Sequence, residues 1–262
     1  MNILLTNDDG IHAPGLMALY QALRGDHHLQ VVAPQSEQSA VGHAISLTTP
    51  LRIKKVNKNG AFFGWAINGT PADCVKIAVA ELLTSTLDLV ISGINLGPNV
   101  GINVLYSGTV SAASEAAILG FRAMAISLDT YKEPDFSGAA RFACQMARQL
   151  PSLPLPPGVS LNVNVPARPS EAIKGIALTR QEISCLAERF ERRVDPRENI
   201  YYWLDGLNER QDPEPGTDYW ALQNGYISIT PIHPDLTHYN TLTEFQKLRS
   251  HLPSPNPTDG KY

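Results

Sequence analysis

Two adjacent aspartates, Asp8 and Asp9, follow the first apolar run of the chain, which covers residues 2–6. The run ends in Asn-Asp-Asp-Gly, a cluster that breaks regular structure, so we expect a buried strand that enters a turn here. Neighbouring strand residues point to opposite faces, so both carboxylates can reach one ion only if the strand has ended, as Gly10 allows. Two carboxylates placed together repel one another unless a cation lies between them. The pair is a candidate cation site, and an ordinary Asp-Asp-Gly turn is the alternative.

Polar side chains also follow the next two apolar runs, over residues 29–33 and 87–92. Open parallel sheets bind ligands beyond the carboxyl ends of their strands, which is where Ser39 and Asn95 stand. Carboxylate, hydroxyl and amide oxygens together favour Mg²⁺ or Mn²⁺ over Ca²⁺ and over zinc. His43 is close in sequence, but a histidine there is more often a loop residue than a ligand. The predicted metal ligands are Asp8, Asp9, Ser39 and Asn95.

A glycine-rich loop runs from Gly93 towards a predicted helix of small residues over 110–119. Such a loop directs backbone N–H groups and the positive end of a helix dipole at an anion. Ser107 and Thr109 add hydroxyl donors, and Gly108 allows close backbone approach. The pattern matches neither GxGxxG nor GxxxxGK[ST], so a Gly/Asn loop capped by Ser or Thr is the alternative. We predict that Ser107, Gly108 and Thr109 bind phosphate.

Basic side chains are scarce around these motifs: Arg24 is the only Lys or Arg in the first fifty residues, and none occurs over 77–121. A phosphate bound here must be neutralised by a metal ion and backbone dipoles, which predicts strict metal dependence. The chain has no Cys followed six residues later by Arg and no Arg-His-Gly, and its acidic pair is not Asp-x-Asp. Attack by metal-activated water, with Asp8 or Asp9 as proton acceptor, is the simplest route.

The elements that must position these residues alternate between strand and helix. This alternation predicts a Rossmann-like α/β fold, a mostly parallel sheet with helices on both faces. Beyond residue 170 the pattern changes to strands of a mixed region, which indicates a β-rich arm. We predict a catalytic core over 1–170, a C-terminal arm with the remaining core elements of the same domain over 171–252, and a disordered tail over 253–262. The predicted strands cover 2–6, 29–33, 87–92, 123–128, 161–165, 176–179, 200–204 and 226–232, and the predicted helices begin near Pro14 and cover 71–83, 110–119 and 139–150.

Composition and charge limit the classes of partner and the compartment that we expect for this protein. The chain has 262 residues, 43% of them hydrophobic, and a net charge of −4. That balance gives no reason to expect a nucleic acid polymer or a membrane as partner. Nothing at the N-terminus resembles a signal peptide, no apolar stretch reaches about 20 residues, and three widely spaced cysteines fit a reducing compartment, so we expect a cytoplasmic protein.

Six stretches of the sequence match one known family: LLTNDDGIHAPGL at 4–16, APQSEQSAVGH at 33–43, NGTPADCV at 68–75, SGINLGPNVGINVLYSGTVSAASEA at 92–116, LNVNVP at 161–166 and TDYWALQNGYISITPI at 217–232. Together these stretches resemble the SurE family, survival protein E, of metal-dependent nucleotidases. The resemblance implies a Rossmann-like core, a swapped C-terminal arm that builds dimers or tetramers, and hydrolysis of nucleoside monophosphates. It implies the same four metal ligands and the same Ser-Gly-Thr phosphate site, whereas Ser111 departs from a more usual glycine.

The sequence and the resemblance together predict a 5′-nucleotidase, a phosphoric monoester hydrolase with one Mg²⁺ or Mn²⁺ per subunit. We expect a homodimer or homotetramer that acts on nucleoside monophosphates. Two alternatives stay open: a related phosphatase acting on 3′-nucleotides or short polyphosphate, and a non-catalytic nucleotide-binding module.

Overall fold

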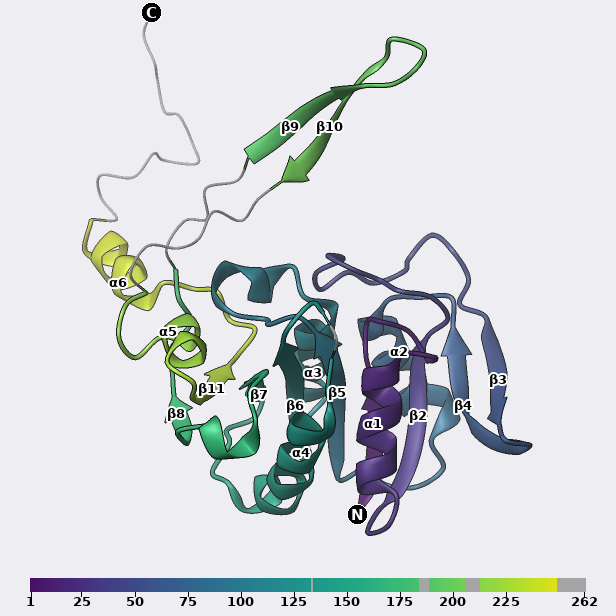
Figure 1. Ribbon diagram of the computed structural model, residues 1–262. Helices are drawn as coiled ribbons and strands as arrows, with labels where there is room; N and C mark the ends of the chain where they lie inside the picture. Colours follow the sequence, from purple (N-terminus) through teal and green to yellow (C-terminus); the bar gives the residue numbers. More distant parts are fainter. Residues whose placement is uncertain (133, 184–188, 206–212, 249–262) are drawn as a thin grey trace, which may run out of the picture.

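The computed structural model describes residues 1–132, 134–183, 189–205 and 213–248, and the predicted tail over 253–262 lies outside them. Nine strands form one sheet in the order β3-β4-β2-β1-β5-β6-β7-β11-β8 (Figure 1). The strands of this sheet are β1 Asn2–Thr6, β2 His28–Pro34, β3 Ile53–Lys58, β4 Ala61–Ile67, β5 Leu89–Leu96, β6 Ala123–Asp129, β7 Ser160–Pro166, β8 Ile176–Leu178 and β11 Ile227–Ile232.

Most neighbours in this sheet are parallel, which confirms the predicted fold class. Strand β1 pairs in parallel with β2 on one side and with β5 on the other. Strands β6 and β7 continue the parallel order, whereas β3 runs against β4 and β11 runs against β7. The chain therefore leaves β1 in one direction and later returns to its other side. The resulting switch point, beyond the carboxyl ends of β1 and β5, is where open α/β sheets bind ligands.

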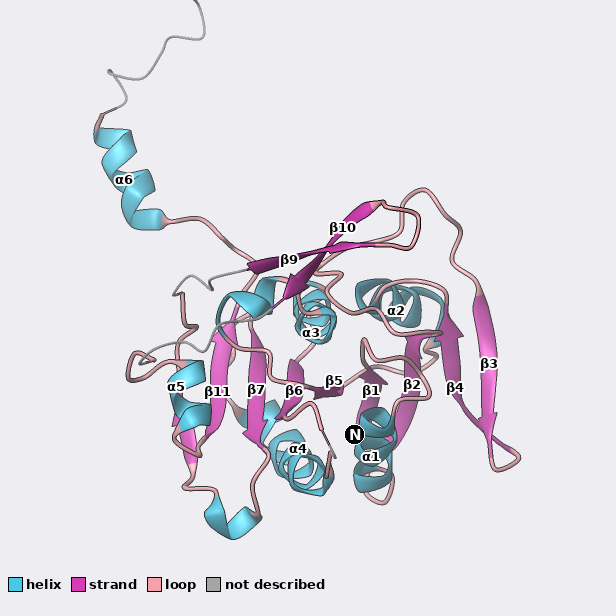
Figure 2. Cartoon of the chain, turned by 45° about the horizontal axis from the view of Figure 1, so that its top comes forward, coloured by secondary structure: helices cyan, strands magenta, loops and turns pink. Residues whose placement is uncertain are grey.

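Helices cover both faces of the sheet (Figures 1 and 2). Because successive strand residues point to opposite faces, Ile3 and Leu5 pack into one apolar cluster and Leu4 into the other. The first cluster includes residues of helices α1 (Pro14–Leu23) and α4 (Ser137–Gln149). The second includes residues of α2 (Pro71–Ile77) and α3 (Gly108–Ile118). None of the helices in the described ranges is long and apolar enough to cross a membrane.

Local signals explain how helix α2 begins. The Thr70 hydroxyl accepts a hydrogen bond from the Asp73 backbone N–H at 3.1 Å, and the Asp73 carboxylate accepts one from the Thr70 N–H at 2.9 Å. This reciprocal capping satisfies two N–H groups that a helix start leaves unpaired, and Pro71 suits the first position because it has no N–H. The predicted start of this helix at residue 71 is confirmed.

Strand β5 differs from its predicted extent, because it continues past Ser92 to Leu96. Asn95 and Leu96 pair with Ser127 and Leu128 of β6, after an irregularity in register at Gly93. The backbone pairing with β6 and the burial of Ile94 outweigh the breaker signal of the local Gly-Ile-Asn sequence. Asn95 therefore lies near the end of a strand rather than in the loop that follows it.

The region after residue 170 divides between the main sheet and a projection. Strands β8 and β11 join the sheet, and helix α5 (Asp218–Gln223), which the sequence pattern missed, packs against β11. Strands β9 (Arg189–Val194) and β10 (Ile200–Asp205) form a separate hairpin that projects from the end of the molecule opposite the N-terminus (Figure 1). Strand β9 and helix α6 (Tyr239–Lys247) were also not predicted.

Candidate active site

The Asp8 carboxylate is held by the N-terminus of helix α3. Asp8 follows β1, is 7% exposed, and accepts a hydrogen bond from the Thr109 backbone N–H at 3.0 Å. The Thr109 hydroxyl donates to the other carboxylate oxygen. A helix N-terminus favours negative charge, so this contact stabilises the ionised carboxylate. The predicted metal-binding and phosphate-binding motifs are thus in direct contact.

Gly108 permits this contact because it has no side chain. A Cβ atom built on Gly108 would lie 2.7 Å from the Asp8 Cβ and 3.0 Å from one Asp8 carboxylate oxygen. Such distances are too short for carbon atoms, so any larger residue pushes Asp8 away from the helix start. Gly108 therefore acts by placing Asp8 against α3.

We expect Gly108→Ala to lower the free energy of unfolding by roughly 1–3 kcal/mol, because overpacking outweighs the helix propensity gained. The matched control is Gly138→Ala in the first turn of α4, where a Cβ would meet nothing within 4 Å. Urea denaturation of both variants measures the difference. Equal stabilities of the two variants would contradict the steric role of Gly108.

Asp9 follows β1, and its carboxylate lies at the end of the neighbouring strand β5. The Leu96 backbone N–H donates a hydrogen bond to its half-buried carboxylate. Burial and then the neighbouring Asp8 charge raise the pKa of Asp9 to about 7. Burial also raises the pKa of Asp8, despite its hydrogen bonds from Thr109. Negative charge is thus crowded here, and a cation would relieve it.

Glu37 forms an acidic cluster with Asp8 and Asp9. Glu37 was not predicted from the sequence as a site residue. Its charge contributes to raising the pKa of both aspartates. It lies in the polar loop after β2, where the Ser39 hydroxyl donates to its carboxylate and the Gln38 N–H donates to the Asp8 carbonyl at 2.8 Å. The sequence signal that could have identified Glu37 is its position two residues before Ser39, a predicted metal ligand.

The other predicted site residues hydrogen-bond to nearby protein groups. The Asn95 amide donates to the Gly97 carbonyl at 2.7 Å. The Ser107 hydroxyl caps α3 by accepting from the Val110 N–H at 3.1 Å, and the Ser111 hydroxyl donates to the Ser107 carbonyl at 2.6 Å. Ser107 and Thr109 therefore shape the start of α3, with Asp8 bound to its first turn.

The loop that carries Ser39 is fastened to helix α2, where the Ser46 N–H donates to the Asp73 carboxylate at 3.0 Å, and to helix α3. His43 Nε2 lies 2.8 Å from the buried Glu115 carboxylate, which also pairs with Lys76 at 3.0 Å. The Gly42 N–H donates to the Tyr106 carbonyl at 2.9 Å. His43 thus contacts Glu115 of α3, which agrees with its interpretation as a loop residue.

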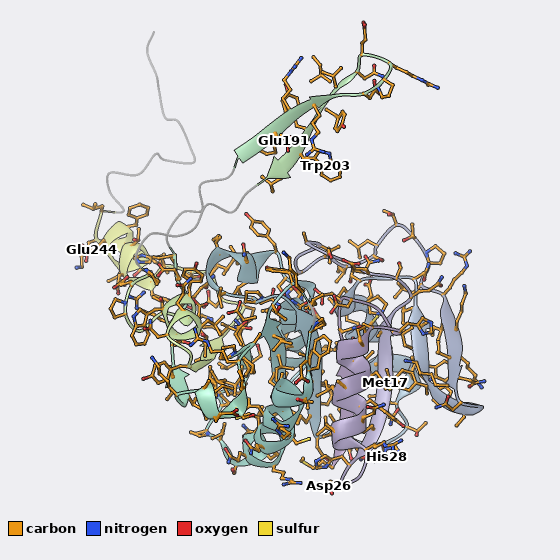
Figure 3. The ribbon with its side chains drawn as sticks, viewed as in Figure 1. Met17, Asp26, His28, Glu191, Trp203 and Glu244 are labelled. Carbon is orange, nitrogen blue, oxygen red and sulfur yellow. The ribbon has the colours of Figure 1, made fainter. Side chains whose placement is uncertain are left out.

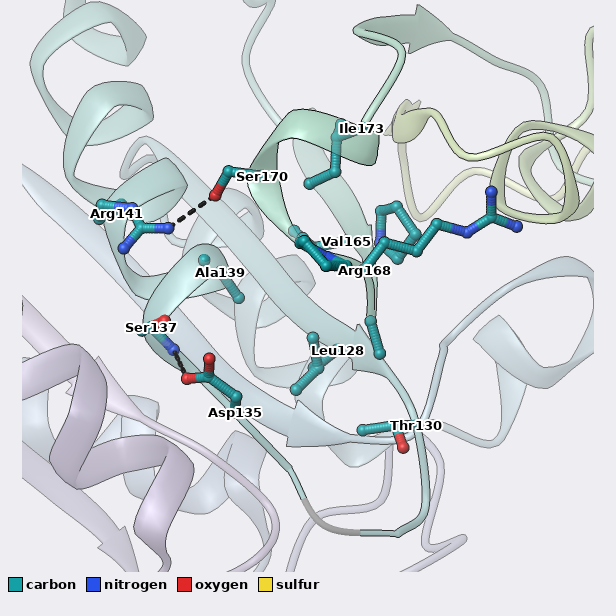
Figure 4. Close-up of a pocket in the computed structure, with 14 residues that line it drawn as sticks. Leu128, Thr130, Asp135, Ser137, Ala139, Arg141, Val165, Arg168, Ser170 and Ile173 are labelled. Atoms are coloured by element: carbon teal, nitrogen blue, oxygen red, sulfur yellow. Dashed lines mark hydrogen bonds between the residues drawn. The ribbon is translucent and has the colours of Figure 1, made fainter.

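In the part of the chain that the structure describes, no group of three or more His, Cys, Asp or Glu side chains converges as an ion site. The predicted ligand set contains only two such residues, because its other members are Ser39 and Asn95. A separate cavity of about 350 Å³ lies beyond β6 and β7 (Figure 4). Its lining includes Arg141, which donates to the Ser170 hydroxyl at 2.7 Å, and it does not include the aspartates.

The fold and this acidic cluster define a doubly wound α/β protein with a candidate oxygen-donor site at its switch point. A family model described as Survival protein SurE matches residues 3–188, and the chain belongs to this family. It is 54% identical over 247 residues to a 5′-nucleotidase SurE of Syntrophobacter fumaroxidans, covering 94% of this chain and 99% of the relative. It is also 54% identical over 251 residues to a 5′-nucleotidase SurE of Syntrophus aciditrophicus, covering 95% and 94%. The crystal structure of a SurE protein from Aquifex aeolicus superimposes with a TM-score of 0.83 at 39% identity, covering 95% of this chain and 100% of that one.

Proposed function

We infer that this chain is a 5′-nucleotidase, a hydrolase that releases nucleoside and phosphate from nucleoside monophosphates. The observation that carries the inference is the 54% identity to relatives named 5′-nucleotidase SurE over nearly the full length of both chains. The geometry supports it, because Asp8, Asp9 and the start of α3 meet at the switch point of the sheet. This is the place where the fold class binds ligands.

We propose that Asp8, Asp9, Ser39 and Asn95 hold one Mg²⁺ or Mn²⁺ ion. Two features of the site fit such an ion: the donors are all oxygens, and the crowded carboxylates have raised pKa values that a cation would lower again. When bound, the ion supplies a Lewis acid for a phosphate oxygen and lowers the pKa of water.

The two aspartates have different surroundings, which suggests different roles. Both Asp8 oxygens accept hydrogen bonds from Thr109, so Asp8 is a fixed ligand. Asp9 is less buried and has no such double attachment to α3, so we assign it the proton of the attacking water. We assign Ser107, Gly108 and Thr109, at the start of α3, to the phosphate oxygens.

A substrate panel tests the proposed function against its alternatives. Phosphate release is measured with Mn²⁺ from 5′- and 3′-mononucleotides, short polyphosphate and an aryl phosphate. We expect the highest kcat/KM with a 5′-mononucleotide. Preference for 3′-nucleotides or polyphosphate would identify the related phosphatase, and saturable nucleotide binding without phosphate release would identify a binding module.

We also propose that the hairpin of β9 and β10 joins subunits into a homodimer or homotetramer. An isolated two-stranded hairpin is only marginally stable in water. This hairpin also exposes large apolar side chains (Figure 3). Phe190, Trp203 and Leu204 are 62%, 58% and 60% exposed. Apolar patches of this kind mark protein interaction sites.

We expect light scattering to give the native protein a mass of two or four times 28.5 kDa. Phe190→Ser combined with Trp203→Ser should shift the population towards the monomer, because the apolar contact is lost. Leu178→Ser, at an 80% exposed position on the edge strand β8, is the control and should leave the mass unchanged. A monomeric native protein would contradict the proposed assembly.

A further inference from the structure

The glycine-rich loop between Asn95 and Ser107 is fastened by buried side chains from distant parts of the chain. Asn164 of β7 binds both backbone polar groups of Asn99: its carbonyl oxygen accepts from the Asn99 N–H at 2.8 Å, and its amide donates to the Asn99 carbonyl at 3.0 Å. Asn162 donates to the same carbonyl at 2.8 Å. Both backbone polar groups of Asn99 are therefore bound by side chains of β7.

A second attachment lies two residues further along, at Gly101. Its N–H donates to the Asp218 carboxylate at 2.8 Å, and its carbonyl accepts from the Gln181 amide at 2.8 Å. The other Asp218 oxygen accepts from the backbone N–H groups of Glu182 and Tyr219, at 3.0 and 2.8 Å. One buried carboxylate thus joins the loop to helix α5, although 117 residues separate Asp218 from Gly101.

The chemistry of these side chains shows what they contribute. Asn164 and Asp218 are both 0% exposed, and a buried amide or carboxylate is costly unless it is fully hydrogen-bonded. Apolar side chains would fill the same positions without that cost. Their hydrogen bonds go to the loop backbone, whose own N–H and C=O groups need partners. The arrangement therefore determines where the loop lies.

We propose that Asn164 and Asp218 are positioning residues for the candidate active site. They hold Asn99 and Gly101, and the loop so held carries the predicted metal ligand Asn95 at one end and the predicted phosphate-binding Ser107 at the other. The inference rests on the proposed function, because it assigns these side chains to the placement of that site. Neither residue contacts the reacting atoms.

Two isosteric variants test the proposal. In Asp218→Asn, the amide oxygen keeps the bonds from Glu182 and Tyr219 and the NH₂ group then faces the Gly101 N–H, so the loop loses its acceptor. In Asn164→Leu, both bonds from Asn164 to Asn99 are lost while the branched shape of the side chain is kept. We expect kcat to fall by roughly tenfold to a hundredfold in each, since small displacements of site groups have effects of this size.

Three further readouts separate positioning from a merely structural role. We expect KM to change less than kcat, amide hydrogen exchange to rise in peptides spanning 95–108, and the Kd for Mn²⁺ measured by calorimetry to increase at least threefold. The control is Thr179→Val, which removes a buried hydroxyl from the same region, 2.7 Å from Ser228 and Thr230. The control should lower the melting temperature and leave kcat and the loop exchange unchanged.

If the folded variants keep the native kcat, loop exchange and Mn²⁺ affinity, the positioning role is overturned while the proposed function stands. If the native protein releases no phosphate from nucleotides, the proposed function fails, and loop exchange and Mn²⁺ affinity still decide the positioning role. Should Asp218→Asn not fold, the half-buried Gln181→Ala removes the neighbouring bond to Gly101 and is judged by the same readouts.

Discussion

Asp8→Asn is expected to abolish phosphate release from nucleoside monophosphates and to leave the fold intact. The asparagine keeps the shape of Asp8. Its amide oxygen can accept from the Thr109 N–H, and its NH₂ group can donate to the Thr109 hydroxyl. We therefore expect the free energy of unfolding to change by no more than about 1.5 kcal/mol. The substitution removes one of the two carboxylates that would hold the metal ion. The metal ion would stabilise the transition state by several kcal/mol, and each ~1.4 kcal/mol corresponds to a factor of ten in rate. Loss of the ion should therefore lower kcat/KM by roughly a thousandfold.

The matched control is Asp26→Asn, which makes the same chemical change before β2, at the opposite end of the sheet (Figure 3). Asp26 is exposed and pairs with Arg148 at 2.5 Å, so its loss should affect neither turnover nor melting appreciably. Steady-state kinetics and thermal denaturation of both variants make the comparison. An Asp8→Asn enzyme that retains most of its activity with added Mn²⁺ would remove Asp8 from the site.

Removal of divalent metal is the second change with a large expected effect. We expect chelator-treated enzyme to release phosphate from AMP at least about a hundredfold more slowly than the same enzyme with Mn²⁺ restored. The reason lies in the distribution of charge: no Lys or Arg occurs over 77–121, and Asp8, Asp9 and Glu37 lie together at the site. Equal rates with and without metal would show that the mechanism is wrong.

The metal-free protein should also respond to pH in a defined direction. The folded-state pKa values of Asp8 and Asp9 are raised above 3.8, so the folded state binds more protons than the unfolded state. Stability from these groups is therefore present at low pH and is lost as pH rises through the window from 3.8 to about 7. We expect the melting temperature of the metal-free protein to decline between about pH 5 and pH 8, and Mn²⁺ to raise it most at the higher pH. The same dependence on pH with and without Mn²⁺ would contradict the site.

The sequence by itself determined the elements whose signals are local. Apolar runs and helical periodicity identified β1, β2, β6, β7, α1, α3 and α4 close to their observed limits, because side-chain burial on a sheet or helix face follows a short repeat. The order of those elements predicted the parallel sheet. Strand ends then drew attention to Asp8, Asp9, Ser39 and Asn95, because parallel strands place their carboxyl ends at one edge.

Only the tertiary structure decided contacts between residues far apart in the chain. No spacing rule brings Thr109 to Asp8, 101 residues away, or Asp218 to Gly101, 117 residues away. Strand β5 continues through Gly93 because β6 offers hydrogen bonds beyond it, and β8 and β11 join the main sheet for the same reason. Hydrogen bonding across the sheet and burial against a second element outweigh local preference. The acidic pair was thus visible in the sequence, whereas its attachment to α3 and the buried support of its loop depend on the folded chain.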